Sequence, residues 1–134
     1  EQWKTAWRVR QIVDTFYTSK TDGLCGNEDC GQMSAWYIFS AAGFYPVNPA
    51  NGIYILGSPA VNEATFHLPN NKKFTIKAIN NSNENVYIQS ASFNGKPYTK
   101  SWFTHAMLMN GGALLLTMGN KPSDFGKEDK DRPK

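Results

Sequence analysis

The sequence has only two cysteines, Cys25 and Cys30, and only two histidines among its 134 residues. A structural zinc site needs CxxC pairs or histidine partners nearby, and both His67 and His105 lie far along the chain from the cysteines. This scarcity argues against a zinc site. The two cysteines either form a local disulfide or remain free buried thiols. We favour free thiols, because a short ring would constrain the loop between them tightly.

Basic clusters, internal repeats and membrane-length apolar runs are also missing. The net charge is only +3, and the lysines are spread without stacking aromatics beside them, which argues against nucleic-acid binding. The apolar segment 33–42 falls short of the about 20 residues that a bilayer span requires. A chain of 134 residues can form one domain with its own core. It opens on Glu1 without a signal segment, so we expect an excerpt of a longer protein.

The hydrophobic pattern predicts an α+β fold, with two N-terminal helices followed by an antiparallel, sandwich-like β region. Apolar residues at helical spacing predict a first helix over 3–18, whose aromatic stripe belongs to the core. Residues 33–42 are apolar nearly all round, which is typical of a buried helix, and Gly43 is placed to end it. After Pro46 the period changes to two. Strands are expected over 53–56, 64–68, 74–79, 86–91, 101–109 and 113–118.

This pattern divides the chain into three segments. Residues 1–46 form a helical hairpin that carries an acidic loop, and residues 47–122 form the antiparallel β region. Residues 123–134 are expected to be a disordered tail, because residues 126–134 mix charges of both signs without an apolar anchor.

The acidic loop, residues 23–32, holds three glycines and the neighbouring carboxylates of Glu28 and Asp29. Asp29 and Gln32 match a capping box, which makes Asp29 the predicted N-cap of the second helix. A cap does not explain Asn27 and Glu28 beside it, since a charge at the entry of a buried helix costs desolvation. A phosphate loop would need a lysine here, and an EF-hand would not place Leu24 at its third position. The loop is therefore either a helix cap or a carboxylate site for proton transfer, a cation or sugar hydroxyls.

Three runs of sequence carry a resemblance to a known family. They are GNEDCGQMSAWY at 26–37, GFYPV at 43–47 and YILGSP at 54–59. Together they resemble glycoside hydrolase family 92, the calcium-dependent, exo-acting α-mannosidases, many of them specific for α-1,2 linkages. The resemblance places the chain at the extreme C-terminus of much longer enzymes. Its two helices would then be the closing part of an (α/α)6 barrel.

The resemblance also implies a chemistry for the acidic loop. Family 92 enzymes invert the anomeric carbon, which takes a general acid and a general base about 6.5–9.5 Å apart. By position Asp29 is the predicted base, with Glu28 and Asn27 as loop partners that contact the base, the water or the sugar, although relatives often carry an acid at the position of Asn27. Ser34 is the residue of the following helix most open to a polar contact with substrate.

Other parts of the expected site lie outside this chain. The resemblance places the general acid and most of the calcium ligands upstream, so no metal ligand is predicted here and the isolated chain is expected to be inactive. The implied partners are mannose-containing glycans, and the implied location is periplasmic, secreted or at the cell surface.

Two alternatives remain open at this point. A non-catalytic carbohydrate-binding β-module would bind sugar on strand aromatics such as Tyr87, Tyr98 or Trp102. A purely structural piece would use the acidic loop only as a helix cap. His67 and His105 are assigned structural roles, because a single histidine among aromatic residues is usually a packing residue.

Overall fold

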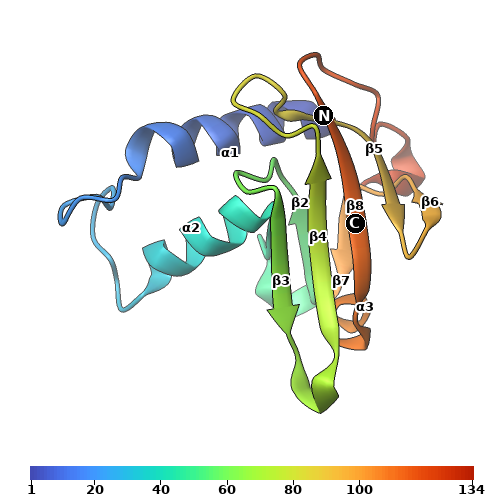
Figure 1. The fold of residues 1–134 in the computed structure, drawn as a ribbon, viewed down its shortest axis with the longest axis horizontal. Coiled ribbons are helices and arrows are strands. Elements are labelled where there is room, and N and C mark those ends of the chain that lie inside the picture. Colours follow the sequence, from blue (N-terminus) through green and yellow to red (C-terminus); the bar gives the residue numbers. More distant parts are fainter.

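The computed structural model describes residues 1–134, except for the side chain of residue 70. Two helices come first in the chain, the strands follow, and a short helix precedes the last strand (Figure 1). The helices are α1 (Gln2–Phe16), α2 (Gln32–Ala42) and α3 (His105–Asn110), and the strands are β1 (Phe44–Tyr45), β2 (Ile53–Leu56), β3 (Glu63–His67), β4 (Lys73–Ile79), β5 (Tyr87–Phe93), β6 (Lys96–Tyr98), β7 (Trp102–Thr104) and β8 (Gly112–Gly119). Three single 3-10 turns lie at Pro49–Asn51, Pro69–Asn71 and Asp129–Asp131.

The strands form two sheets, one with the order β1-β2-β7 and one with the order β3-β4-β8-β5-β6. All neighbouring strands are antiparallel except β4 and β8, which run parallel from the pair Phe74 and Gly112 to the pair Ile79 and Thr117. The predicted α+β fold is confirmed, but the β region is mixed and not wholly antiparallel. Parallel neighbours need a long crossover, and residues 80–111 provide it by building β5, β6, β7 and α3 in between.

A single hydrophobic core joins the two sheets. Phe103 of β7 stacks on Phe74 of β4 with ring centroids 5.3 Å apart and an interplanar angle of 26°. Phe44 packs edge-on against Phe103 at 5.1 Å and is 1% exposed. Since Phe44 comes from the expected helical segment, that segment and the sheets share this core. The expected division of the chain at residue 46 stays a prediction.

Two elements differ from the expected strands. The run 101–109 is not one strand, because α3 starts directly after β7. The Thr104 hydroxyl accepts a hydrogen bond from the backbone N–H of Met107 at 3.1 Å, which caps α3 and ends the strand. The short strand β6 was not expected. It forms a hairpin with β5 through Asn94 and Gly95, whose φ angles of 49° and 78° suit a two-residue turn.

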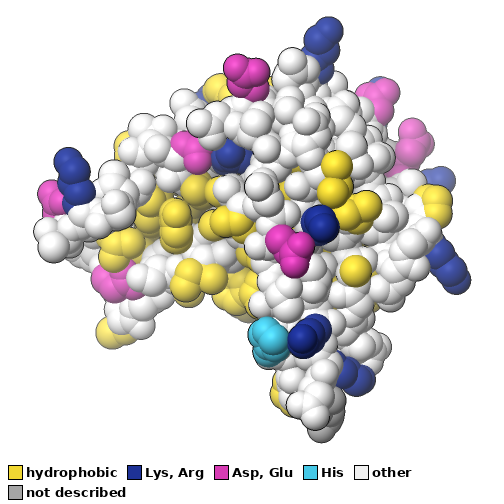
Figure 2. Space-filling model, in the orientation of Figure 1, with side chains coloured by type: hydrophobic (Ala, Val, Ile, Leu, Met, Phe, Trp, Pro, Cys, Tyr) yellow, Lys and Arg dark blue, Asp and Glu magenta, His cyan; other side chains and the backbone are white. Residues whose placement is uncertain are grey.

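The two N-terminal helices extend beside the sheets and leave much apolar surface open (Figures 1 and 2). In α2 only Ser40, Ala41 and Ala42 are buried, whereas Ile38 is 59% exposed. In α1 Phe16 is 53% exposed. The predicted burial of α2 and of the aromatic stripe is therefore wrong for most of their length. Hydrophobic periodicity shows which faces can be covered, and the described chain covers only those next to the sheets.

The last twelve residues are ordered against the sheets and do not form the disordered tail that was expected. Asp131 is 5% exposed, and its carboxylate accepts a hydrogen bond from the Thr99 hydroxyl at 2.7 Å. The Asp131 carbonyl accepts two more, from the backbone N–H of Ser101 at 2.9 Å and from its hydroxyl at 3.0 Å. Phe125 supplies the apolar anchor by packing against the core. This anchor lies just before the charged residues, so their composition alone did not reveal it.

Candidate active-site loop

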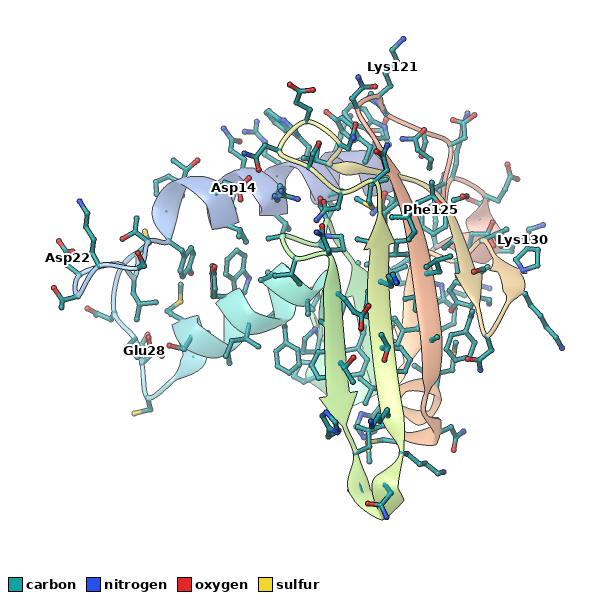
Figure 3. All side chains as sticks on the ribbon, viewed as in Figure 1. Asp14, Asp22, Glu28, Lys121, Phe125 and Lys130 are labelled. Atoms are coloured by element: carbon teal, nitrogen blue, oxygen red, sulfur yellow. The ribbon has the colours of Figure 1, made fainter. Side chains whose placement is uncertain are left out.

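The acidic loop connects the ends of α1 and α2 that lie farthest from the sheets (Figure 3). Two backbone hydrogen bonds close its first half, from Thr18 N to the Gly23 carbonyl at 2.9 Å and from Gly23 N to the Lys20 carbonyl at 3.0 Å. A Cβ at position 23 would lie 2.1 Å from the Thr18 carbonyl oxygen, so only glycine fits there. The start of the loop is thus fixed to the end of α1.

The second half of the loop has an unusual backbone. Asp29, Cys30 and Gly31 all have positive φ angles, of 51°, 60° and 97°. Non-glycine residues adopt this left-handed region at a cost, and aspartate tolerates it better than most. The N-cap of α2 is Gly31, and no side-chain cap hydrogen bond is made there. The prediction of Asp29 as N-cap is therefore wrong, because the left-handed residues turn the chain between Asp29 and the helix.

Glu28 provides the carboxylate that reaches the start of α2 (Figure 3). Its Oε1 atom accepts a hydrogen bond from the backbone N–H of Ser34 at 3.1 Å. Its carbonyl oxygen accepts another from the N–H of Met33 at 3.2 Å. Its Oε2 atom is shielded from solvent and has no hydrogen-bond partner among the described residues. Glu28 is therefore the half-buried, anchored acid of the loop.

Asn27 and Asp29 lie on either side of Glu28, and both are exposed to solvent. Ser34 is half-buried and lines an open cavity of about 400 Å³ between the helices, together with Tyr17, Thr18, Ser19, Leu24, Tyr37 and Ile38. The structure thus brings the four predicted site residues to one end of the helix pair. Only Glu28 and Ser34 are joined by a hydrogen bond. Exposed Asp29 is free to meet water or a ligand.

Tyr17 belongs to the surroundings of the loop, which the sequence pattern did not indicate. Its ring stacks on Trp36 at 5.4 Å and 22° and lies 5.1 Å from the ring of Tyr37. Burial raises the pKa of Tyr17, and the nearby Cys25 and Glu28 raise it further. The sequence placed Tyr17 only in the core stripe of α1. Its position as the last apolar residue before the loop was the signal available.

The two cysteines stand on either side of the three polar loop residues. Cys25 and Cys30 are both free and both exposed. The preference for free thiols is confirmed, whereas their expected burial is wrong. Residues 29–31 turn outward in the left-handed conformation, and the loop has no cover from the rest of the described chain.

The aromatics that a carbohydrate-binding module would use are engaged within the protein. The Tyr98 hydroxyl donates to the Trp102 carbonyl oxygen at 2.6 Å, and burial raises the pKa of Tyr98 to about 12. Tyr87 packs edge-on against Trp3 at 6.5 Å, and Lys100 Nζ lies 4.5 Å from the ring of Trp102. All three candidate side chains are at most half-exposed. The structure therefore offers no ready platform on them.

The two histidines were expected to be packing residues, but both are exposed to solvent. His105 Nδ1 lies 2.9 Å from the Tyr54 hydroxyl, at the junction of β2 and α3. His67 ends β3 opposite Lys73 of β4 and is exposed.

The described side chains do not fit a resident metal ion. No group of three or more histidine, cysteine, aspartate or glutamate side chains converges among them. The carboxylate oxygens of Glu28 and Asp29 alone are fewer than the six to eight oxygen ligands that calcium takes.

Within the described chain, no helix has both the length and the apolarity to cross a membrane.

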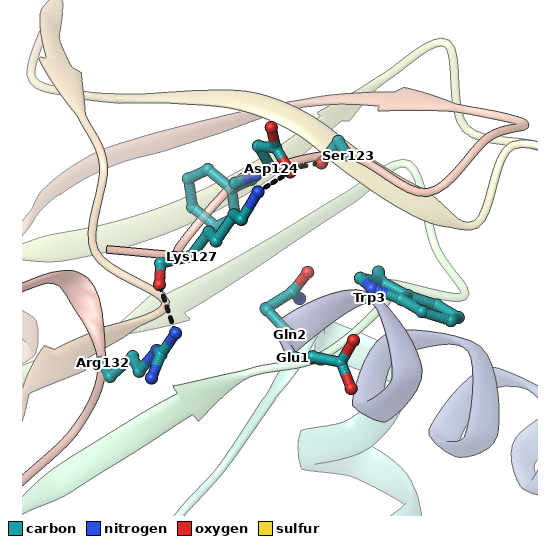
Figure 4. A pocket seen from close by; sticks show the side chains of 8 residues that line it. Glu1, Gln2, Trp3, Ser123, Asp124, Lys127 and Arg132 are labelled. Atoms are coloured by element: carbon teal, nitrogen blue, oxygen red, sulfur yellow. Dashed lines mark hydrogen bonds and ion pairs between the residues drawn. The ribbon is translucent and has the colours of Figure 1, made fainter. Parts of the chain in front are cut away.

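A second cavity, of about 160 Å³, lies away from the loop, between the start of α1 and the C-terminal segment (Figure 4). Its charged groups are already engaged: Lys127 pairs with Asp124 at 3.2 Å, and Arg132 donates to the Lys127 carbonyl at 2.6 Å. This arrangement stabilises the C-terminal segment and leaves the acidic loop as the better candidate site.

Known proteins are similar to this chain over nearly its whole length. The family model described as the glycosyl hydrolase family 92 catalytic domain matches residues 1–120. A protein of Arthroderma benhamiae described as an uncharacterized secreted glycosidase is 34% identical over 132 residues, which cover 96% of this chain and 17% of that protein.

Two solved structures from Bacteroides thetaiotaomicron are similar over almost the whole chain. One is a family GH92 inverting mannosidase, with 42% identity and a TM-score of 0.93 over 99% of this chain. The other is a family GH92 α-mannosidase in complex with mannoimidazole, with 41% identity and a TM-score of 0.96 over 100% of this chain. Each alignment covers 18% of the solved chain, so the sequence spans less than a fifth of the length of these relatives.

Proposed function

The chain belongs to glycoside hydrolase family 92, and from this premise we propose that it is part of an inverting α-mannosidase that removes terminal mannose from glycans. The observation that carries the proposal is the acidic loop, where an exposed aspartate stands next to a glutamate anchored to a helix. Support also comes from the two Bacteroides structures, one of an inverting mannosidase and one solved with mannoimidazole.

In this proposal Asp29 is the general base. An inverting hydrolase needs a carboxylate that takes a proton from water on the face of the sugar opposite the leaving group. Asp29 is exposed, so water can reach its carboxylate. It stands close to the N-terminus of α2, where the helix dipole favours negative charge. The general acid that protonates the leaving oxygen would come from outside residues 1–134.

Substrate contacts and the remaining features of the enzyme follow from the same premise. Asn27 and Ser34 flank the loop carboxylates and would donate to or accept from sugar hydroxyls. Exo action, α-1,2 preference and a calcium ion that engages the sugar are proposed from family likeness, with the calcium ligands outside the described residues. Secretion is proposed because the Arthroderma relative is described as secreted. Alone, without a general acid, residues 1–134 would be inactive.

The test is Asp29→Asn in a family-length protein that carries this chain, with Asp22→Asn in the same connection between α1 and α2 as the matched control. Asparagine tolerates the φ of 51° at position 29, and the site is exposed, so folding should be unchanged. Loss of the base should lower the hydrolysis of α-1,2-linked mannobiose by about 10²–10⁴-fold. The control should keep its rate, and NMR should show β-mannose as the first product.

Two outcomes would contradict the proposal. Near-normal turnover by Asp29→Asn would show that Asp29 is not the base. Failure of the wild-type protein to hydrolyse any α-mannoside would reject the function itself.

A further inference from the structure

We propose that Glu28 is a positioning residue, which holds the loop so that its neighbour Asp29 faces the substrate. This inference rests on the proposed function, because it takes Asp29 as the base. It gives Glu28 a role through α2 in place of the expected contact with the base, the water or the sugar.

The oxygen atoms of Glu28 accept hydrogen bonds from the first turn of α2. The first N–H groups of a helix have no partner within the helix. Gly31, the N-cap of α2, has no side chain that could accept from them. Glu28 supplies the acceptors for two of them: its carbonyl for Met33 N at 3.2 Å and its Oε1 for Ser34 N at 3.1 Å. Removing the Glu28 side chain would therefore leave the N–H of Ser34 without its acceptor and remove the side-chain bond that holds the loop to α2.

The Glu28 side chain also encloses a strained stretch of backbone. The hydrogen bond between Glu28 and Ser34 closes a ring that contains Asp29 and Cys30, both at positive φ. Such conformations persist only where the surroundings fix them. With Glu28 attached to α2 on one side and Gly31 leading into α2 on the other, the orientation of Asp29 is determined by the helix.

Glu28 and Asp29 also differ in how far solvent can reach their carboxylates. A general base must come within hydrogen-bond reach of the proton it accepts. Glu28 is half-buried, with one oxygen bonded to the helix and the other shielded from solvent, whereas Asp29 is exposed. We therefore infer that the length of the Glu28 side chain, which lets it reach Ser34 N, matters for the site and that its negative charge does not.

The test separates reach from charge with three variants of the family-length protein. Glu28→Gln keeps the length and an acceptor oxygen but loses the charge. Glu28→Asp keeps the charge but is one methylene too short to reach Ser34 N in the same way. Glu28→Ala loses both. We expect kcat to fall less than about 10-fold for Gln and about 100-fold for Asp and Ala, the cost of a misplaced catalytic group.

Two further readouts exclude a merely structural effect. All three variants should keep the acidic limb of the pH–rate profile and a near-normal KM, because Asp29 remains. Amide exchange of Ser34 should stay slow in Gln and become faster in Asp and Ala.

The proposal is overturned if Glu28→Asp is more active than Glu28→Gln, or if Glu28→Gln loses the acidic limb, since Glu28 would then take part through its charge. Full activity of Glu28→Ala would overturn it too. If the wild-type protein hydrolyses no α-mannoside, the proposed function fails, while exchange at Ser34 still decides whether Glu28 holds the loop.

Discussion

Arg10 of α1 donates a hydrogen bond from Nη1 to the carbonyl oxygen of Pro59 at 2.6 Å, although 49 residues separate them in the sequence. The same guanidinium reaches Asn81 Oδ1 at 3.2 Å and the Ser82 carbonyl at 3.3 Å, and its Nε atom lies 3.0 Å from Asp14. Pro59 follows a strand of one sheet, and Asn81 and Ser82 follow a strand of the other. One side chain therefore attaches α1, which leads into the acidic loop, to both sheets.

Arg10→Met should destabilise the family-length protein. Arg10 is 4% exposed, and its removal leaves the Pro59 carbonyl oxygen buried without this donor. We expect a loss of at least about 2 kcal/mol, seen as a lower melting temperature. Arg8→Met on the same helix is the control, because Arg8 is exposed and lies 4.4 Å from the Trp7 ring, a contact worth about 0.5–1 kcal/mol. Equal losses of stability in the two variants would show that the buried hydrogen bonds of Arg10 do not stabilise the protein more than the exposed contact of Arg8.

Gly43→Ala should also destabilise the protein. Gly43 ends α2 with a φ of 100°, and a Cβ there would lie 2.6 Å from Cγ of Pro59. The left-handed backbone alone costs an alanine about 1–2 kcal/mol, and the clash adds about 1–3 kcal/mol. Gly95→Ala isolates the first cost, because its φ is 78° and its Cβ would meet nothing within 4 Å. Melting temperatures should fall further for Gly43→Ala, and the opposite order would refute the role of the Pro59 contact.

Local patterns predicted the elements whose causes are local. The change of hydrophobic period after Pro46 located most strands, and Gly43 marked the end of α2 as predicted. The burial of α2 could not be predicted, because an apolar helix face does not say which part of a longer protein covers it. The start of α3 after β7 was missed because one hydroxyl, that of Thr104, ends the strand.

The candidate site was chosen by motif resemblance, and the geometry of its loop was only partly predictable. The spacing of Asp29 and Gln32 matches a capping box, yet the acid that reaches α2 is Glu28. Spacing assumes that the helix starts directly after its cap. It carries no information on the three left-handed residues at 29–31, which move the start of α2 away from Asp29.

Tyr98 should make the protein sensitive to alkaline pH. Burial raises the pKa of its hydroxyl from 10.0 to about 12. Since the folded pKa lies above the unfolded one, this contribution to stability is complete below pH 10 and disappears as the pH rises toward 12. Tyr98→Phe also loses the hydrogen bond to the Trp102 carbonyl, which costs about 1 kcal/mol at neutral pH.

The measurement is the melting temperature of both proteins across the alkaline range. The difference between wild type and Tyr98→Phe should shrink as the pH rises above 10. A difference that stays constant with pH would show that Tyr98 does not titrate in this way.

The isolated chain of 134 residues should not hydrolyse α-mannosides. Asp29 can accept a proton from water, but in the proposed function the general acid that protonates the leaving oxygen lies outside residues 1–134. The measurement is mannose release by the purified chain, with a family-length protein as the positive control. Turnover above the level of an Asp29→Asn chain would contradict the expectation.

The same isolated chain should self-associate through the open surface of its two helices (Figure 2). Ile38 is 59% exposed and lines the cavity between α1 and α2 together with Tyr37, Leu24 and Tyr17. Exposed apolar patches of this kind drive association in water.

Ile38→Glu should weaken the association, because it places a charge within the surface that would be covered. Val61→Glu is the matched control, since Val61 is 42% exposed in the segment between β2 and β3 and lies outside both helices. Sedimentation velocity over a concentration series should show a larger average mass for the wild type and Val61→Glu than for Ile38→Glu. A wild-type chain that stays monomeric at every concentration would contradict the prediction, and an equal effect of the two substitutions would show that the helices are not the contact surface.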